Sequence, residues 1–285
     1  MNNFKGKVVF ATGGAGGIGY GLAEGLYKEG CKVILADIDE KQLEKAKASF
    51  PGECLTVVLD VTDRDSWAAA KEKALAEYGQ VDILLNVAGI MRNPLLPHDK
   101  QGILDCTPKD WDKMIGINLT GMYNGVITFG PEMRERGEGY ILNTSSTQGL
   151  IPTAWVGSYS ASKFAVTAMT EALHDELEGC GISVSVLFPG VTQSRLAINA
   201  VKDAGIQIDE DKMKMPGMTL EECAKRTIRA MKRNDLYIIT HGEYAPYCRE
   251  RFDKIMGAFA DCPPSPEYDP SKPLPGTREW ANGNR

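Results

Sequence analysis

The sequence predicts an α/β protein in which helices cover both faces of a parallel β-sheet. The first indication is the alternation of strand-like and helix-like segments along most of the 285 residues, which is typical of doubly wound sheets. The second is a glycine-rich turn between the first strand-like and the first helix-like segment. The third is composition, because 43% apolar residues suffice for one large core. We therefore expect a single α/β domain with a C-terminal extension.

Short apolar runs predict the strands, and helical periodicity fills most of the intervals between them. Strands are expected at residues 7–12, 32–37, 55–60, 81–86, 139–145, 182–188 and 236–240. Helices are expected notably at residues 17–29, 40–49, 63–78, 108–136 and 158–178. Right-handed crossovers make such a sheet doubly wound, and functional groups then gather at the carboxyl ends of its strands.

The first unit is a strand, a glycine turn and a helix, which is how a Rossmann fold for dinucleotides begins. The turn reads Thr12-Gly13-Gly14-Ala15-Gly16-Gly17-Ile18-Gly19. Glycines let the backbone approach a pyrophosphate, and the helix N-terminus offers free N–H groups and a positive dipole end. The turn fits G-x-G-x-x-G through Gly14, Gly16 and Gly19, or T-G-x-x-x-G-x-G through Thr12, Gly13, Gly17 and Gly19. A merely flexible turn is the alternative.

The second strand ends in an acid, Asp37. A carboxylate at this place accepts hydrogen bonds from a ribose 2′-hydroxyl and repels a 2′-phosphate. No Arg or Lys lies inside the glycine turn or directly after Asp37. The sequence therefore favours NAD over NADP, although a strand-end acid that caps the next helix is an alternative interpretation.

Tyr159 and Lys163 are four residues apart in Ser158-Tyr159-Ser160-Ala161-Ser162-Lys163, which places phenol and ammonium on one face of a helix. A free tyrosine has a pKa of about 10. A positive charge beside it favours the phenolate and lowers that pKa. The pair is therefore able to exchange a proton with an alcohol near neutral pH.

These motifs follow the order and spacing of the short-chain dehydrogenase/reductase family, which the chain resembles from about Gly6 to about Ile239. The glycine turn resembles the family's cofactor turn in the second register. Asn86-Val87-Ala88-Gly89 resembles its Asn-Asn-Ala-Gly motif, with Val87 in place of the second asparagine. Ser146 precedes Tyr159 by 13 residues, the family's usual spacing. Pro189-Gly190-Val191 resembles the turn beside the nicotinamide, and Ser194 stands where a threonine is usual.

The resemblance implies that the protein interconverts a secondary alcohol and its ketone with NAD. Tyr159 is expected to be the general base in oxidation and the general acid in reduction. Lys163 would lower the pKa of Tyr159 and bind the nicotinamide ribose, and Asn118 would hold a water that links Lys163 to solvent. Ser146, preferred over Ser145 on spacing alone, would donate a hydrogen bond to the substrate oxygen. The expected cofactor-binding residues are Thr12, Gly13, Gly17, Ile18, Gly19, Asp37, Asp60, Val61, Asn86, Ala88, Gly89, Tyr159, Lys163, Pro189, Gly190 and Val191.

Two other function classes stay open. One is an epimerase or dehydratase of related fold with tightly bound NAD, which retention of the cofactor through purification would favour. The other is a non-catalytic cofactor-sensing protein. The proton apparatus of Asn118, Ser146, Tyr159 and Lys163 argues against a sensor, whereas His174 lies off the motif and is interpreted as structural.

The substrate side is less specific. Residues 192–218 are rich in Leu, Ile and Met and suit a lid over an apolar substrate; the alternative is an amphipathic surface helix. Residues 94–97 and Trp155 are candidates for further pocket walls. The strand end 236–239, followed by a long helix, is similar to dehydrogenases of bulky aryl or alicyclic alcohols, and a steroid-like alcohol fits the same pattern.

Domain boundaries are expected at residue 242. Residues 1–242 would form the catalytic domain, and residues 243–285 a helix followed by a proline-rich tail. That tail would cover a neighbouring subunit's site or be disordered. An alanine stripe at Ala161, Ala165, Ala168 and Ala172 predicts a homo-oligomer, with a tetramer favoured and a dimer as the alternative.

Charge and cysteine usage exclude several classes. A net charge of −6 argues against nucleic acid or an anionic membrane as the main partner. Seven cysteines without C-x-x-C or metal-like clustering suggest free thiols, no metal and a reducing compartment. No secretory stretch or membrane-spanning run is apparent, so a cytoplasmic location is expected.

Overall fold

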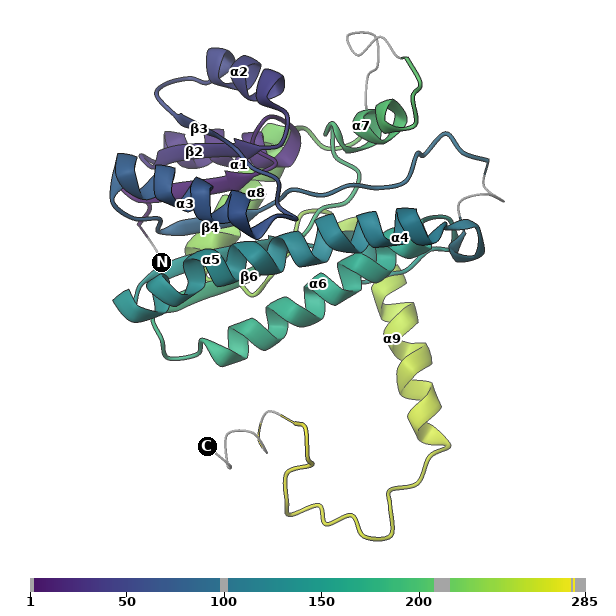
Figure 1. The fold of residues 1–285 in the computed structure, drawn as a ribbon. Coiled ribbons are helices and arrows are strands. Elements are labelled where there is room, and N and C mark those ends of the chain that lie inside the picture. The colour runs from purple at the N-terminus through teal and green to yellow at the C-terminus, as the bar shows by residue number, and fades with distance from the viewer. Residues whose placement is uncertain (1–2, 98–101, 208–215, 278, 280–285) are drawn as a thin grey trace. The chain divides into compact units, whose positions relative to one another are not determined.

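The computed structural model describes residues 3–97, 102–207, 216–277 and 279. The chain forms two compact units, Met1–Gly242 and Glu243–Arg285. The first unit contains a seven-stranded sheet in the order β3-β2-β1-β4-β5-β6-β7 (Figure 1), and each neighbouring pair of strands is parallel. The predicted doubly wound α/β sheet is therefore confirmed.

The strands lie close to their expected positions. They are β1 (Val8–Thr12), β2 (Lys32–Asp37), β3 (Leu55–Val58), β4 (Ile83–Asn86), β5 (Gly139–Thr144), β6 (Ile182–Phe188) and β7 (Tyr237–Ile239). The strand expected at 55–60 ends early because Asp60 begins a turn, in which its Oδ1 accepts hydrogen bonds from the backbone N–H and the hydroxyl of Thr62. The strand order reverses at β1 and β4, where ligands bind in sheets of this kind.

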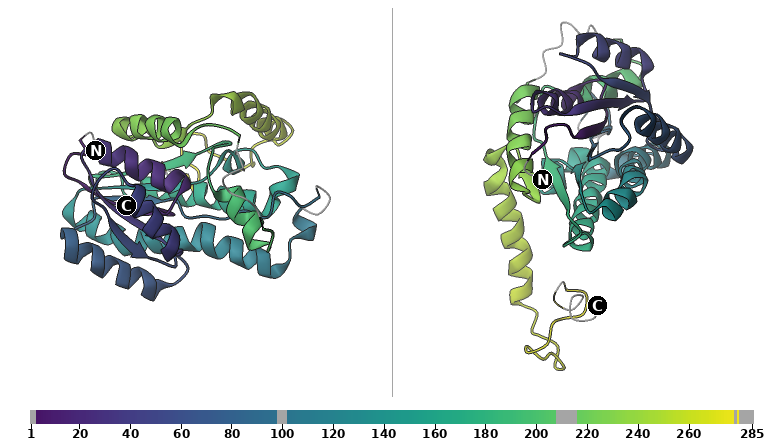
Figure 2. Two further views of the ribbon diagram at one scale, coloured as in Figure 1. Left: turned by 90° about the horizontal axis from the view of Figure 1, so that it is seen from above. Right: turned by 90° about the vertical axis from the view of Figure 1, so that its left-hand side faces the viewer.

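Helices cover both faces of the sheet (Figure 2). The helices of this unit are α1 (Gly17–Lys28), α2 (Glu40–Ser49), α3 (Arg64–Tyr78), α4 (Pro108–Ile115), α5 (Gly121–Arg136), α6 (Gly157–Glu176), α7 (Leu196–Asp203) and α8 (Leu220–Arg233). Helices α1 and α8 pack on one face and contact each other closely, because Gly25 of α1 leaves room for Ile228, whose Cδ1 lies 2.6 Å from the ideal Cβ position of the glycine.

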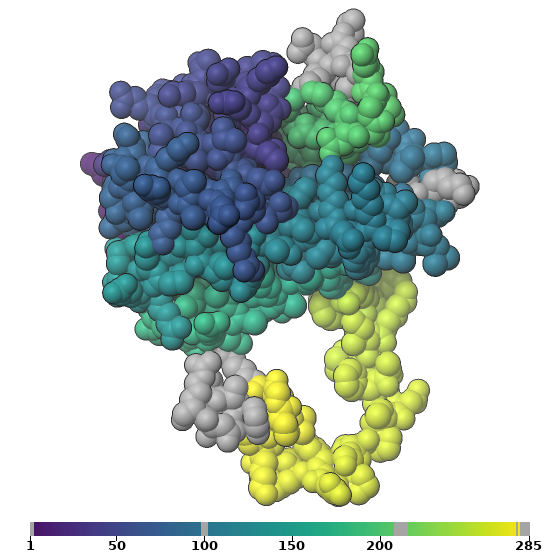
Figure 3. Space-filling model, viewed as in Figure 1, coloured from purple at the N-terminus to yellow at the C-terminus, as the bar shows by residue number. Residues whose placement is uncertain are grey.

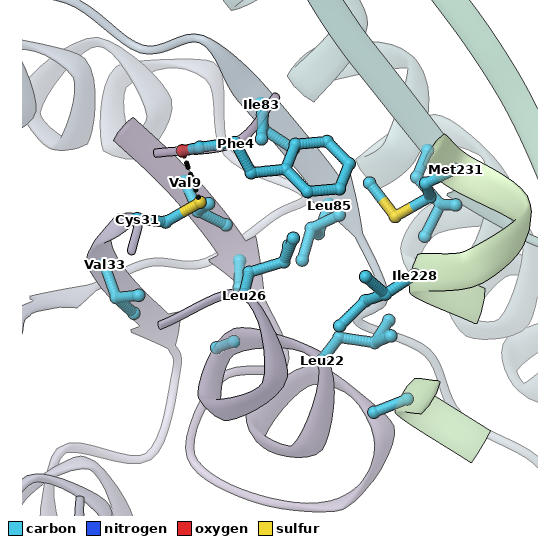
Figure 4. Close-up of a cluster of buried hydrophobic side chains, with 14 of the residues drawn as sticks. Phe4, Val9, Leu22, Leu26, Cys31, Val33, Ile83, Leu85, Ile228 and Met231 are labelled. Carbon is cyan, nitrogen blue, oxygen red and sulfur yellow. Dashed lines mark hydrogen bonds between the residues drawn. The ribbon is translucent and has the colours of Figure 1, made fainter. Parts of the chain in front are cut away.

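Two apolar clusters hold these layers together, one on each face of the sheet. Figure 4 shows the first, in which Leu22 and Leu26 of α1 pack with Ile228 and Met231 of α8 against strand residues that include Val9. On the other face, the ring of Phe10 lies 5.0 Å from that of Phe129 on α5. Neighbouring β1 residues thus face opposite clusters, which explains why the residues from Val8 to Ala11 are all apolar and buried.

The helix expected at 108–136 is not continuous. A π-helical turn, Gly116–Thr120, separates α4 from α5 and contains the buried Asn118. Single π turns inside α-helices are frequent at functional sites. The apolar pattern alone did not indicate this turn, because a π turn changes the register of the helix without introducing a helix-breaking residue.

The second unit contains the helix α9 (Ala245–Ala260), at the start of the C-terminal segment where a helix was expected. Its apolar side chains, including Tyr247, Phe252 and Phe259, are exposed. Residues 262–277 form turns but neither helix nor strand. In the part of the chain that the structure describes, no helix has the length and apolar character needed to cross a membrane.

Candidate active site

A cavity of about 550 Å³ lies at the carboxyl ends of the strands. It is lined by most of the residues that the sequence singles out: Gly13, Gly17, Ile18, Gly19, Asp37, Asp60, Val61, Ala88, Gly89, Ser146, Tyr159, Lys163, Pro189 and Gly190. Four expected residues do not line the cavity: Thr12, Asn86 and Asn118, which are buried, and Val191, which is exposed. Among the described residues, no group of three or more His, Cys, Asp or Glu side chains could hold a metal ion.

The glycine turn has a backbone that other residues would disturb. Gly13 and Gly17 have φ angles of 65° and 57°, which favour glycine. A Cβ atom on Gly19 would lie 2.4 Å from the carbonyl oxygen of Gly13. Helix α1 begins after Gly16 with neither a side-chain cap nor an acidic residue in its first turn. Its first N–H groups and dipole are therefore suited to an anionic group in the cavity.

Asp37 lies beside this turn, at the end of β2. Its Oδ2 accepts a hydrogen bond from the Ala15 N–H at 3.2 Å, and its Oδ1 accepts one from the Asp39 N–H. Burial raises the pKa of the Asp37 carboxyl, and these backbone hydrogen bonds oppose that effect. The exposed side chain of Ile38 also lines the cavity. Together they offer a hydrogen-bond acceptor and an apolar surface to a nucleoside.

Thr12 and Asn86 support the turn without lining the cavity. The Thr12 hydroxyl donates to the carbonyl oxygen of Leu85 and accepts hydrogen bonds from the N–H groups of Val87 and Ala88. It thereby ties the end of β1 to the segment after β4. The Asn86 amide instead donates to Asn143 Oδ1 and the Met122 carbonyl oxygen. Its side chain thus braces β4 against β5 and α5, so any cofactor contact of Asn86 would come from its backbone.

Ser146, Tyr159 and Lys163 converge on the cavity from two elements. Ser146 follows β5 and is hydrogen-bonded to Tyr159 on α6. Lys163 is one helical turn further along α6, and its Nζ lies 5.5 Å from the centroid of the Tyr159 ring. The same Nζ donates to the Thr144 carbonyl oxygen at 2.8 Å. Ser145 points away from this group, since its hydroxyl donates to the Lys163 carbonyl oxygen in the helix.

Burial changes the expected electrostatics of the pair. Burial raises the pKa of Tyr159 to about 12, although the hydrogen bond with Ser146 acts to lower it. Burial also lowers the pKa of Lys163 to about 7. The expectation that the lysine charge lowers the pKa of the phenol is therefore wrong for this structure, because the site disfavours both charges. The first proton that the pair loses on raising the pH comes from the ammonium group.

Asn118 holds the segment that follows β4. Its Oδ1 accepts a hydrogen bond from the Ile90 N–H at 2.7 Å, and its Nδ2 donates to the Ile90 carbonyl oxygen at 2.9 Å. Both Asn118 Oδ1 and Lys163 Nζ approach Gly89, at 3.2 and 3.5 Å from its ideal Cβ position. The side chain of Asn118 therefore positions the backbone beside Lys163, and its role in holding a water stays a prediction.

The sequence model of the short chain dehydrogenase family matches residues 7–205. The chain belongs to the short-chain dehydrogenase/reductase family, and it is an oxidoreductase. It is 34% identical to the C alpha-dehydrogenase of Sphingobium sp. over 284 residues, which cover 94% of this chain and 91% of that protein. It is also 34% identical to the 2,5-dichloro-2,5-cyclohexadiene-1,4-diol dehydrogenase of Sphingobium indicum, over 71% of this chain and 79% of the relative.

A solved structure of the family supports the fold in detail. The short-chain dehydrogenase/reductase of Burkholderia phymatum, crystallised with NAD, superposes with a TM-score of 0.80 at 27% identity. The match covers 96% of this chain and 99% of that one.

Several cavity residues of this dehydrogenase were not apparent from its sequence. The Cδ atom of Arg195 lies 2.7 Å from the ideal Cβ position of Gly16, so a basic side chain covers the glycine turn from a distant segment. The sequence has no Arg or Lys inside the turn or directly after Asp37, but the fold places Arg195 beside the turn. Thr144, which lines the cavity, and His241, which does not line it but packs against Gly190, were also missed. Only Arg195 carries a signal in the sequence, namely its position directly after Ser194 in the family's nicotinamide region.

The residues present fit a dinucleotide. The cavity joins the uncapped helix N-terminus, the Asp37 carboxylate and the Ser146, Tyr159 and Lys163 group. Thr144 also lines it, and its Oγ1 is buried without a hydrogen-bond partner, which a bound polar group would supply. Side chains of α7, drawn in green in Figure 3, line one side of the cavity. On this side Lys113 of α4 and Asp203 of α7 form an ion pair at 3.0 Å.

Proposed function

We propose that the protein is an NAD-dependent dehydrogenase that interconverts a hydrophobic secondary alcohol and its ketone. The observation that carries this proposal is the convergence of Ser146, Tyr159 and Lys163 on the same cavity as the glycine turn and Asp37. Proton-transfer groups and a dinucleotide cradle in one cavity are the parts that a hydride transfer with proton exchange requires.

The residues divide the work as follows. When bound, the nicotinamide supplies the acceptor or donor of hydride. Tyr159 takes the hydroxyl proton in oxidation and returns it in reduction, because its hydroxyl lies beside Ser146 in the cavity. Ser146 donates a hydrogen bond to the substrate oxygen, where negative charge develops in the transition state. Lys163 exchanges the proton with Tyr159, and its Nζ would hold the nicotinamide ribose when the cofactor is bound.

Tyr159 and Lys163 titrate as a coupled pair. The form with a neutral phenol and a neutral amine contains as many protons as the form with a phenolate and an ammonium group. Loss of the first proton, near the lowered pKa of about 7 for Lys163, therefore already produces a pair that is able to act as a base. This explains how a phenol whose own pKa is raised to about 12 serves near neutral pH.

The surroundings of the site favour a bulky apolar substrate. Ile103, Leu104 and Trp155 are exposed, and Ile103 packs against Gly157 at the start of the helix that carries Tyr159. Exposed apolar side chains next to a catalytic group suit an aryl or alicyclic alcohol. A relative that is named for a cyclic diol supports the same class. Residues 208–215 of the expected lid, which include Met213 and Met215, lie outside the described residues.

The proposal is tested with a panel of secondary alcohols and ketones. The panel contains fluorenol-like, benzylic, alicyclic and steroid alcohols, and formation or consumption of NADH is followed by absorbance. We expect turnover with at least one cyclic or aryl alcohol. No turnover with any member, together with NAD that stays bound through purification, would favour an epimerase or dehydratase and contradict the proposal.

We predict that NAD is preferred over NADP and that Asp37→Ala narrows the preference by about tenfold. The carboxylate repels a 2′-phosphate at contact distance, and removing such a repulsion from a partly buried site is worth at least about 1 kcal/mol. The kcat/KM values with both cofactors measure the effect. Asp235→Ala, which removes an acid outside the cavity, should leave the ratio unchanged. Preference of the wild type for NADP would contradict the assignment.

We also predict a homo-oligomer, with a tetramer favoured over a dimer. Ala168 and Ala172 of the alanine stripe are exposed on α6 and do not face the sheet. Tyr123 and Ile127 on α5 are exposed as well. Exposed apolar side chains on neighbouring helices are typical of subunit interfaces. Light scattering at micromolar concentration measures the mass, and a monomer would contradict the prediction.

A further inference from the structure

His241 is a buried histidine that the catalytic mechanism does not use. It follows β7 and is only 5% exposed. Its imidazole packs against the turn after β6, where Cγ lies 2.7 Å from the ideal Cβ position of Gly190. Any larger residue at position 190 would therefore collide with the ring, so glycine and histidine fit together at this point.

The imidazole makes hydrogen bonds to both sides of that turn. Its Nδ1 accepts the Gly190 N–H at 3.0 Å, and its Nε2 lies 3.1 Å from the Val191 carbonyl oxygen. Since a backbone N–H only donates, Nδ1 carries no proton. The ring is thus the neutral tautomer with hydrogen on Nε2, which donates to Val191. The Thr240 hydroxyl lies 2.8 Å from Nδ1 and 3.3 Å from the Phe188 carbonyl oxygen, and its single proton is donated to one of these two acceptors at a time.

The Val191 carbonyl oxygen is a junction between three segments. Besides His241, it accepts a hydrogen bond from the Met218 N–H at 2.9 Å. The Gln193 N–H in turn donates to the Met218 carbonyl oxygen at 2.9 Å, and Thr192 and Met218 form a parallel bridge. The segment before α7 is therefore hydrogen-bonded to the segment before α8. We call this pairing of residues 191–193 with Met218 the joint, and His241 connects it to the end of β7.

The residues that follow the joint form one wall of the cavity. Thr192, Ser194, Arg195 and Asn199 all line it, and Arg195 lies over Gly16 of the glycine turn. The Pro189 carbonyl oxygen, at the start of the same turn, accepts hydrogen bonds from the Thr147 N–H and the Ser146 hydroxyl. A shift of this turn would thus reach the catalytic side of the cavity. Asp37 and Ile38 lie at the end of β2, which β1, β4 and β5 separate from β6 in the sheet.

We propose that His241 is a positioning residue that sets the affinity of the cavity for the nicotinamide half of the dinucleotide. It acts through Gly190 and Val191, whose backbone it holds with one accepted and one donated hydrogen bond. The inference rests on the proposed function, in which this cavity binds NAD. It goes beyond that function because it separates the control of the two halves of the cofactor.

The test compares NADH with AMP, which contains only the adenosine half. In His241→Phe the ring volume is kept but both hydrogen bonds are lost. We expect the Kd of NADH to rise about tenfold or more, because the two hydrogen bonds from the imidazole to Gly190 and Val191 are lost. The Kd of AMP should stay within about twofold of the wild-type value. His241→Gln retains one donor and one acceptor, and its Kd for NADH should lie between those of the wild type and His241→Phe. His174→Phe, the same substitution on α6 away from the cavity, is the matched control and should bind both ligands as the wild type does.

Fluorescence titration with NADH and calorimetric titration with AMP provide the Kd values, and circular dichroism verifies folding. If His241→Phe does not fold, His241→Gln alone decides, and a Kd for NADH equal to that of the wild type overturns the proposal. Equal weakening of NADH and AMP also overturns it, because it indicates a general loss of structure. A wild type that binds AMP but not NADH contradicts the proposed function itself, and the role of His241 with it.

Discussion

The substitution Tyr159→Phe is expected to lower kcat by about 10²–10⁴-fold, the usual contribution of general acid–base catalysis. Phenylalanine keeps the ring in the cavity but removes the only group in the proposed mechanism that contacts the substrate oxygen and exchanges its proton. NADH binding should change little, because the glycine turn and Asp37 are on other elements. Steady-state kinetics in both directions and NADH fluorescence measure the two effects separately.

Ser158→Ala is a suitable control for this change. Ser158 is the neighbouring buried residue on α6, and it does not line the cavity. The kcat of this variant should stay within a few fold of the wild-type value, so a much larger fall of kcat in Tyr159→Phe would be specific to the phenol. A folded Tyr159→Phe enzyme with near-normal kcat would refute the proton-transfer role, and hydride transfer would then need separate proof from cofactor turnover.

The second large effect is expected for Lys163→Met, which should lower kcat and weaken NADH binding together. In the wild type, kcat/KM for oxidation should rise through an apparent pKa close to the value of about 7 for Lys163, because the coupled pair loses its first proton there. In the variant only the phenol titrates, and burial holds its pKa at about 12. The rise should therefore move beyond pH 10. An unchanged pH profile would show that the pair does not act as one unit.

The same substitution has a consequence for stability. Burial lowers the pKa of Lys163 from 10.5 in the unfolded chain to about 7. Between these two values the unfolded state binds more protons than the folded state, so this lysine makes the wild type more stable as the pH rises. The cost of the buried ammonium group is present in full below about pH 7. Lys163→Met removes that cost.

The difference in the free energy of unfolding between the variant and the wild type should therefore favour the variant most at pH 6 and favour it less at pH 9.5. Urea unfolding of both proteins at the two pH values measures this difference. A difference that does not depend on pH would mean that Lys163 is not strongly desolvated in the folded chain. The loss of the hydrogen bond from Nζ to Thr144 affects both pH values and does not change the direction.

Sequence reasoning predicted the sheet and most helices because those signals are local. The apolar run of β1 and the glycines that follow it are recognisable by themselves, since a buried strand and a tight turn each restrict the residues they contain. The expected helix that carries Tyr159 and Lys163 is also present, as α6. The spacing of these two residues within one helix places them on one face, whatever the rest of the chain does.

The sequence was less informative where a residue's role depends on distant segments. Arg195 reaches Gly16, and His241 reaches Gly190, 51 residues away in the chain. No local pattern marks His241, and Arg195 is marked only by its position directly after Ser194, because each acts through a contact made only after the strands have assembled in their order. The π turn at Asn118 belongs to the same class, since its side chain is held by the backbone of Ile90.

The sequence by itself determined the family, the parallel sheet and the glycine turn, and it singled out Tyr159 and Lys163 as the candidate proton-transfer pair. Only the tertiary structure decided the electrostatics of that pair. From spacing alone, a positive Lys163 beside Tyr159 should lower the pKa of the phenol. In the folded chain both groups are buried, and the cost of removing each charge from water outweighs their mutual attraction. Desolvation depends on every atom packed around the pair, and therefore no pattern of residues along α6 could have predicted it.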